Sequence, residues 1–220
     1  MRAYQGEMDI LVAGGHGKVA LRLLRLLAAQ GHTARGLIRS PAQAADLRAV
    51  GAVPVVGDLE NDDTLDAYVK GADAVVFAAG AGPGSGAARK RTVDLGGAVK
   101  LADAARTTGV RRYVMVSSIG ADRPGSAGES MRAYLQAKAE ADEYVRSSGL
   151  DHTIVRPGSL TDEPGTGLVT VSAELGNRGP VPRDDVAAVL AAVLTTPHTI
   201  GATFELFAGE TPIPAALAAL

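Results

Sequence analysis

The stretch that decides the fold is Asp9-Ile-Leu-Val-Ala-Gly-Gly-His-Gly-Lys-Val-Ala20. It opens with a short, mostly apolar run that is typical of a strand buried on both faces. Glycines follow at 14, 15 and 17, and an Ala/Leu-rich stretch with helical spacing begins at Lys18. Strand, glycine turn and helix in this order predict a dinucleotide-binding turn, because the free N–H groups and the dipole at a helix start attract a diphosphate.

Three positions of this turn have separate physical roles. Gly14 permits the tight turn after the strand. Gly17 lets the backbone approach a pyrophosphate closely, and Ala20 stands where many such turns carry a third glycine. A methyl group at that position still allows close packing of helix on strand, so the pattern supports a bound dinucleotide.

The residues between these positions are further candidates for contact with the cofactor. We expect the backbone of Gly15 and Val19 to belong to the binding turn. His16 and Lys18 flank it, and each either adds to phosphate binding or points into water.

The rest of the chain alternates short apolar runs with longer helical stretches. This alternation predicts βαβ units with right-handed crossovers, and therefore an α/β fold with one Rossmann-like, doubly wound parallel sheet and helices on both faces. A single NAD(P)-binding domain would span 1–220. Predicted strands are 9–13, 33–38, 53–56, 74–78, 113–117, 153–156, 168–171 and 203–207. Predicted helices are 18–30, 42–50, 62–70, 87–108, 130–148, 184–194 and 214–220.

The end of the second strand indicates which dinucleotide binds. An NAD site usually has an acidic residue there, which binds the ribose hydroxyl groups. This chain has Arg39 followed by Ser40. A guanidinium can bind a 2′-phosphate through two hydrogen bonds, which favours NADP(H) over NAD(H). The alternative is a solvated charge at the end of a strand.

Two further strand ends lie where the cofactor would cross the sheet. Asp58 and Leu59 follow the third strand, at the place of an adenine ring. Asp58 either accepts a hydrogen bond from the adenine amino group or is a turn or N-cap residue. Ala78, Ala79 and Gly80 follow the fourth strand, where small residues let the backbone pass close to the cofactor.

A tyrosine, a lysine and two serines supply candidate catalytic groups. Tyr134 and Lys138 are four residues apart on a predicted helix, so their side chains share one face. An ammonium beside a phenol favours the phenolate and makes the hydroxyl a better proton shuttle. Ser117 and Ser118 end the fifth strand and point to opposite sides, so one of them at most orients a substrate carbonyl. The alternative for the Tyr–Lys pair is an ordinary surface pair.

Together these motifs resemble the short-chain dehydrogenase/reductase superfamily, and most of all its small atypical NAD(P)H-binding members, which are similar to sugar epimerases and to flavin or biliverdin reductases. The likeness rests on the glycine turn, on Arg39, on the segments 57–59, 113–118 and 134–138, and on 148–158, which ends in Arg-Pro-Gly.

The resemblance implies one bound NADP(H) and a Ser–Tyr–Lys set for proton and hydride transfer. Ser118 would orient the substrate, Tyr134 would be the acid/base, and Lys138 would activate it and contact the cofactor. Pro157 and Gly158 would lie beside the nicotinamide, with Ser117 nearby. The substrate would meet a small region formed by 119–131 and 159–182, which disfavours large nucleotide-sugar substrates.

Composition excludes several other functions. The chain of 220 residues has no Cys, so disulfides, thiol nucleophiles and Cys-ligated metals are excluded. Its four His lack ligand spacing, so we expect no metal. A net charge of −2 argues against nucleic acid, and no apolar run is long enough for a membrane. We expect a soluble cytoplasmic protein whose partner is a small-molecule substrate.

These expectations define a function and two alternatives. The chain is expected to be an NADP(H)-dependent oxidoreductase acting on a small carbonyl, quinone or flavin-like acceptor. It could instead be a non-catalytic NADP(H)-sensing regulator, or a small epimerase or isomerase.

Overall fold

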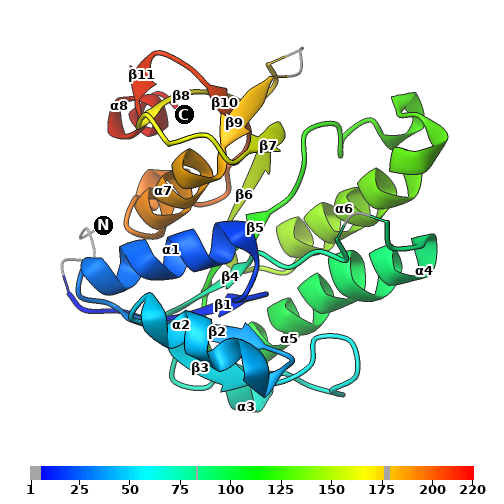
Figure 1. Ribbon diagram of the computed structural model, residues 1–220. Coiled ribbons are helices and arrows are strands. Elements are labelled where there is room, and N and C mark those ends of the chain that lie inside the picture. The colour runs from blue at the N-terminus through cyan, green and yellow to red at the C-terminus, as the bar shows by residue number, and fades with distance from the viewer. Residues whose placement is uncertain (1–5, 83, 176–178) are drawn as a thin grey trace.

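One sheet forms the centre of the computed structural model, which describes residues 6–82, 84–175 and 179–220 (Figure 1). Within these residues nine strands are joined in the order β11-β8-β10-β6-β5-β4-β1-β2-β3. The seven strands β10, β6, β5, β4, β1, β2 and β3, which are neighbours in this order, are all parallel. Strand β8 is antiparallel to both β10 and β11. The sheet strands are β1 (Asp9–Ala13), β2 (Thr33–Ile38), β3 (Val53–Val56), β4 (Ala74–Phe77), β5 (Arg112–Val116), β6 (Asp151–Pro157), β8 (Leu168–Ser172), β10 (Thr203–Ala208) and β11 (Thr211–Pro212).

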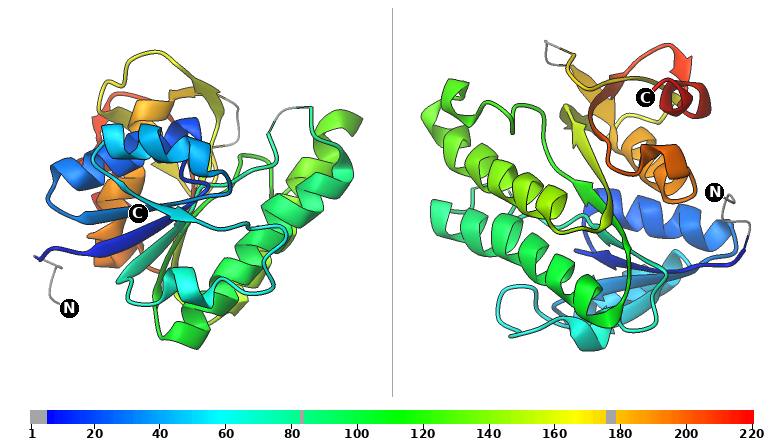
Figure 2. Two further views of the ribbon diagram at one scale, coloured as in Figure 1. Left: turned by 60° about the horizontal axis from the view of Figure 1, so that its bottom comes forward. Right: turned by 180° about the vertical axis from the view of Figure 1, so that it is seen from behind.

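Helices cover both faces of this sheet, as Figure 2 shows. On one face α1 (Lys18–Ala29) packs against α7 (Arg183–Leu194), and the short α2 (Ala44–Ala49) joins the same apolar core. On the other face α5 (Ala98–Thr108) packs between α3 (Asp66–Val69) and α6 (Glu129–Ser147). The predicted Rossmann-like architecture is confirmed, and the strand order reverses between β1 and β4, where such sheets bind ligands.

The eight predicted strands are all present, with ends that differ by at most two residues. Three short strands were not predicted: β11 and the pair β7 (Ser159–Thr161) and β9 (Pro180–Pro182), which form a small parallel sheet. They are two or three residues long, too short for a periodic pattern, and β9 and β11 also contain proline.

The predicted helix 62–70 is wrong for most of its length, because only Asp66–Val69 is helical. The Asp62 carboxylate accepts hydrogen bonds from the Asp58 N–H at 2.7 Å and from the Tyr68 hydroxyl at 2.9 Å. These bonds hold the preceding residues as a loop, since an aspartate side chain competes with the helical pattern for backbone N–H groups.

The predicted helix 87–108 is interrupted. It consists of α4 (Ala87–Arg89), a π-helix η2 (Lys90–Gly97) and α5. Gly96 and Gly97 lie at the end of the π-helical stretch, and glycine lowers the preference for a regular α-helix. The wider turn matters for the site, because π-helical segments often occur at functional positions.

Near the C-terminus, the short helix α8 (Ile213–Ala218) packs against β8 and α7. In the described part of the chain, no helix has both the length and the apolar character needed to cross a bilayer.

Candidate functional site

A groove follows the carboxyl ends of the parallel strands and consists of two adjoining pockets. The first lies beside β1, β2 and β3 and has a volume of about 290 Å³; we call it the narrow pocket. The second lies beside β4, β5 and β6 and has a volume of about 810 Å³; we call it the wide cavity. Gly17 and residues 78–81 line both, so the two are continuous.

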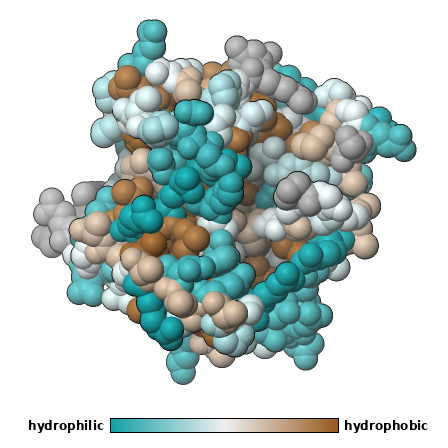
Figure 3. All heavy atoms as spheres, viewed as in Figure 1, coloured by the Kyte–Doolittle hydropathy of each residue, from teal (hydrophilic) through white to brown (hydrophobic). Residues whose placement is uncertain are grey.

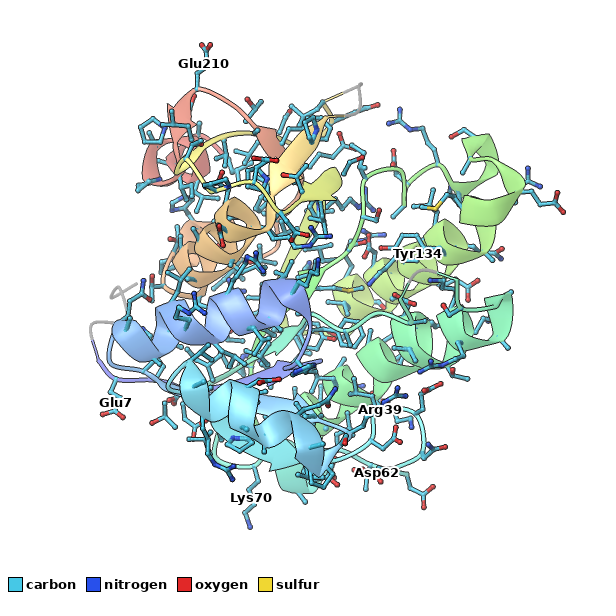
Figure 4. All side chains as sticks on the ribbon, viewed as in Figure 1. Glu7, Arg39, Asp62, Lys70, Tyr134 and Glu210 are labelled. Carbon is cyan, nitrogen blue, oxygen red and sulfur yellow. The ribbon has the colours of Figure 1, made fainter. Side chains whose placement is uncertain are left out.

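Hydrophilic and hydrophobic side chains both surround this groove. Figure 3 shows hydrophilic and hydrophobic residues intermingled on this face of the molecule. In Figure 4, Arg39 and Tyr134 lie on the same side of the molecule but well apart, Arg39 toward β2 and Tyr134 on α6. Arg39 lines the narrow pocket and Tyr134 lines the wide cavity. A ligand that reaches both must be elongated, as a dinucleotide is.

The glycine turn has the geometry that a diphosphate needs. Gly14 has φ +81°, and a Cβ atom there would lie 2.7 Å from the Cα atom of Ala79. Gly17 is the N-cap of α1 with an extended backbone, and no side chain caps this helix. Gly17, Lys18 and Val19 line the wide cavity, so the first turn of α1 borders the groove without a competing side-chain acceptor. These residues fit the diphosphate of NAD(P)H.

His16 and Lys18 are both engaged by carboxylates of the chain itself. His16 Nε2 lies 2.7 Å from Asp46 Oδ2, and the Lys18 ammonium donates to Asp162 Oδ2 at 2.7 Å. His16 still lines the narrow pocket and Lys18 the wide cavity. The structure thus adds a third possibility to the two left open by the sequence: both side chains are held by surface carboxylates at the edge of the groove.

Arg39 lies at the end of β2, exposed, on the wall of the narrow pocket. Asp58 lines the same pocket, but its carboxylate is used within its own loop. It accepts the Glu60 N–H at 2.8 Å and the Asn61 side-chain amide at 2.9 Å. The Asn61 hydrogen bond is the largest cause that lowers the pKa of Asp58, and the Arg39 charge adds to it. Of the two roles open for Asp58, the structure shows the turn residue.

The far wall of the narrow pocket is an ion pair that the sequence did not indicate. Glu60 Oε2 lies 2.6 Å from Arg89 Nη2, and Glu60 Oε1 accepts from the Thr92 hydroxyl at 2.7 Å. Glu60 and Arg89 both line the pocket, and Arg89 comes from α4. Because the partners are 29 positions apart in sequence, no local pattern predicts the contact.

Tyr134 and Lys138 both face the wide cavity, as the four-residue spacing indicated. The Lys138 Nζ atom lies 5.8 Å from the centre of the Tyr134 ring. Its side chain is only 3% exposed and donates to the Val116 carbonyl at 3.1 Å. The pair is therefore not the surface pair of the alternative reading.

Asp94 is the residue of this site that sequence reasoning missed. It is fully buried in the π-helix η2, and its Oδ1 atom lies 3.3 Å from Lys138 Nζ. Its Oδ2 atom accepts the Ala81 N–H at 3.1 Å. The available signal in the sequence was a charged residue two positions before Gly96 and Gly97 in a predicted helix. A buried aspartate must pair with a cation or lose its charge.

The two serines at the end of β5 have different surroundings, and both line the wide cavity. Ser118 is half-buried and donates to the Ile119 carbonyl at 3.3 Å. Ser117 is buried and lies beside Asp142; burial raises the pKa of that carboxyl, and Ser117 opposes part of the rise. Ser118 is therefore the serine that is more accessible to a ligand.

A second buried ion pair lies behind these residues. Arg156 of β6 binds Asp142 of α6, with Nη2 2.8 Å and Nε 2.9 Å from Oδ2. Burial raises the pKa of Asp142, while the Arg156 charge opposes that rise. Asp142 follows Lys138 by four residues, so one face of α6 carries the tyrosine, the lysine and this carboxylate.

Pro157 and Gly158 end β6 and line the wide cavity. A Cβ atom on Gly158 would collide with the Gly179 carbonyl and the Phe207 ring, so only glycine fits where β6 gives way to β7. The expected substrate-side segments contribute Met131 and Leu160, which also line the cavity.

Two expected cofactor residues line neither pocket. Gly15 donates its N–H to the Leu37 carbonyl at 2.9 Å, and a Cβ atom there would lie 2.8 Å from Gly36, so it serves the packing of the turn on β2. Ser40 is the N-cap of the 3₁₀ turn Pro41–Gln43 through its backbone, without a side-chain hydrogen bond. The other expected residues line one pocket or both: Gly14, His16, Gly17, Lys18, Val19, Arg39, Asp58, Leu59, Ala78, Ala79, Gly80, Ser117, Lys138, Pro157 and Gly158.

A family model described as NAD(P)H-binding matches residues 14–197. The chain belongs to this NAD(P)H-binding family. The uncharacterised sugar epimerase YhfK of Bacillus subtilis is 39% identical over 212 residues, which are 96% of this chain and 99% of that protein. A Bacillus halodurans structure described as an NAD-dependent epimerase/dehydratase has a TM-score of 0.93 at 43% identity, covering 97% of this chain and 100% of that one.

A more distant structure is ChuY, described as an anaerobillin reductase from Escherichia coli O157:H7. It has a TM-score of 0.76 at 25% identity, covering 90% of this chain and 96% of that one. The family and these neighbours make the chain an NAD(P)H-binding protein of the oxidoreductase- and epimerase-like type. In the residues that the structure describes, no cluster of three or more metal-ligating side chains is present.

Proposed function

We propose that this protein is an NADP(H)-dependent oxidoreductase of the atypical short-chain dehydrogenase/reductase type, which reduces a small carbonyl, quinone or flavin-like acceptor. The observation that carries the proposal is the position of Tyr134 and Lys138 in a cavity that continues into the glycine-turn groove. A proton donor thus lies at one end of a channel whose other end fits a dinucleotide.

Each residue of the set has a defined task. NADPH, when bound, supplies a hydride. Ser118 would donate a hydrogen bond to the acceptor oxygen and hold it toward Tyr134, which gives that oxygen a proton. The Lys138 ammonium stabilises negative charge on the phenol oxygen as the proton leaves. Asp94 and the Val116 carbonyl hold that ammonium in place at 3.3 Å and 3.1 Å. Hydride and proton together convert a carbonyl to an alcohol.

We also propose a preference for NADP(H). Arg39 stands at the end of β2, where NAD-specific sites place a carboxylate. Asp58, which lines the narrow pocket, is held by its own loop, so it is poorly placed to accept from ribose hydroxyl groups. A guanidinium there offers two donors to a 2′-phosphate.

Tyr134→Phe tests the reaction. We expect loss of NADPH oxidation by about 10²- to 10⁴-fold against a panel of aldehydes, quinones and flavins, with unchanged NADPH affinity, because only the proton donor is removed. Tyr144→Phe is the matched control on the same helix, since its hydroxyl donates to Asp103 at 2.6 Å instead of lining the cavity.

Other outcomes identify the alternatives. If the wild-type protein binds NADPH but oxidises it with no acceptor of the panel, it is a sensor and not a reductase. If it interconverts a sugar epimer without net oxidation of NADPH, it is an epimerase, which the name of the Bacillus subtilis relative suggests for that protein.

A further inference from the structure

We infer that the acceptor carries a carboxylate or a similar anionic group, and that Lys90 binds this group. The inference rests on the proposed function and deepens it, because it names the substrate class of the same cavity. It comes from the charges on the wall of the wide cavity and from which of them already have a partner.

Four cations and one carboxylate line this cavity: Lys18, Lys90, Lys138, Arg183 and Asp94. Asp94 pairs with Lys138. Asp162, which lies outside the cavity lining, pairs with Lys18 at 2.7 Å and with Arg183 at 2.9 Å. Three of the four cations therefore have a carboxylate partner from the chain itself.

Lys90 differs from the other three. In the described part of the chain no carboxylate lies within ion-pair distance of its ammonium. The ammonium donates to the Gly82 carbonyl at 2.8 Å and lies 5.1 Å from the centre of the Tyr134 ring. A half-buried cation whose hydrogen bond goes to a neutral carbonyl gains from an anionic ligand, since such a ligand adds Coulomb attraction to the hydrogen bond.

The position of Lys90 also restricts the ligand. Its ammonium is closer to the Tyr134 ring than the Lys138 ammonium is, at 5.1 Å against 5.8 Å. An anion on Lys90 would therefore lie near the Tyr134 ring, on the wall of the same cavity. Met131 and Leu160, exposed by 44% and 37%, line the same cavity and suit an apolar body. The class of substrate is an aldehyde, ketone or quinone with an apolar or aromatic body and an acidic group.

The test compares two acceptors that differ in one charge, 4-carboxybenzaldehyde and its methyl ester. We expect wild-type kcat/KM to be at least about tenfold higher for the acid than for the ester, and we expect this ratio to fall to about 1 in Lys90→Met. Arg91→Met is the matched control: it removes one positive charge at the next position, but Arg91 pairs with Glu140 and does not line the cavity. It should keep the wild-type ratio.

Two measurements separate this inference from its alternatives. If Lys90→Met weakens NADPH binding as much as it lowers the ratio, Lys90 is a cofactor contact and the inference is overturned. If the ester is reduced as well as the acid by wild-type protein, the reductase stands and the anion site does not.

If neither acceptor is reduced, the panel of aldehydes, quinones and flavins still decides the proposed function, and binding decides the inference. 4-(Hydroxymethyl)benzoate would be titrated into the NADPH-loaded protein and followed by ligand NMR. Binding to wild type and to Arg91→Met that is lost in Lys90→Met supports the anion site, and equal binding to all three, or to none, overturns it.

Discussion

The two ends of the groove are built in different ways. The narrow pocket is shaped by backbone, by Gly14 and Gly17, and the contact between His16 and Asp46 on its border is exposed. The wide cavity has exposed charges at its edge, such as Lys18, but buried charges at Lys138 and Asp94. Lys138 pairs there with Asp94, and Arg156 pairs behind it with Asp142.

This difference separates binding from chemistry. Backbone N–H groups at a helix start bind a phosphate at little cost, because they are already in place when the helix forms. A buried ion pair loses hydration, which its mutual attraction and hydrogen bonds must offset, so it depends on good geometry. The wide cavity should therefore be sensitive to removal of a charge, and the narrow pocket to a change of shape.

Asp142→Ala should have the largest effect on stability. It removes the closer carboxylate of buried Arg156 and leaves only Asp122, 3.9 Å away; breaking a buried pair typically costs about 3–5 kcal/mol of unfolding free energy. Thermal or urea unfolding measures this. Asp162→Ala is the control, because it removes an exposed carboxylate that pairs with Lys18, and it should change the melting temperature little. Equal losses in the two variants would end the contrast between buried and exposed pairs.

Gly14→Ala should have the next largest effect, at the shape of the turn. The methyl group would approach Ala79 to about the 2.7–2.9 Å range at a φ of +81°. Backbone strain alone costs about 1–3 kcal/mol, so we expect NADPH affinity to fall by about tenfold or more. Gly31→Ala is matched in φ, at +84°, but has open space around its Cβ position. A similar loss of affinity in Gly31→Ala would show that crowding at the groove is irrelevant.

Arg39→Ala should have a smaller and more selective effect. Loss of a charge-assisted contact to the 2′-phosphate should weaken NADPH binding by about 10- to 100-fold and NADH binding much less. Fluorescence titration with both nucleotides measures the difference. Arg48→Ala is the control, because it removes the same charge from an exposed residue of α2 that lines neither pocket. The proposed NADP preference is wrong if Arg39→Ala weakens both nucleotides equally.

Lys18→Met should have the smallest effect. Its ammonium is bound to Asp162 in an exposed pair, with the two side chains 66% and 50% exposed. Such pairs contribute little, and we expect NADPH affinity to change by less than about threefold. A loss of tenfold or more would mean that Lys18 leaves Asp162 and binds the diphosphate.

Some residues of the groove could be predicted from the sequence and others could not. The turn at Gly14–Gly17, the end of β2 at Arg39 and the face shared by Tyr134 and Lys138 follow from spacing, because each depends on residues within one element or one turn. Asp94 could not be found in this way, since its burial depends on a π-helical turn that brings it against α6.

Local contacts also decide what the sequence left open. The Asp58 carboxylate accepts hydrogen bonds from its neighbours Glu60 and Asn61. The sequence allowed this turn role but did not favour it over a contact with adenine. Gly15 was expected to contact the cofactor because it lies in the same glycine turn as Gly14 and Gly17. Only the pairing of β1 with β2 shows that its N–H is bound to Leu37.

The amino-acid sequence alone determined the alternation of strand and helix, the parallel sheet and the position of the dinucleotide turn, because hydrophobic period and glycine placement act over a few residues. The tertiary structure decided which charges are neutralised. Lys138 meets Asp94, Arg156 meets Asp142, and Lys90 is left with a carbonyl and a ring. Electrostatic pairing acts through space between elements far apart in the chain, so no spacing in the sequence encodes it.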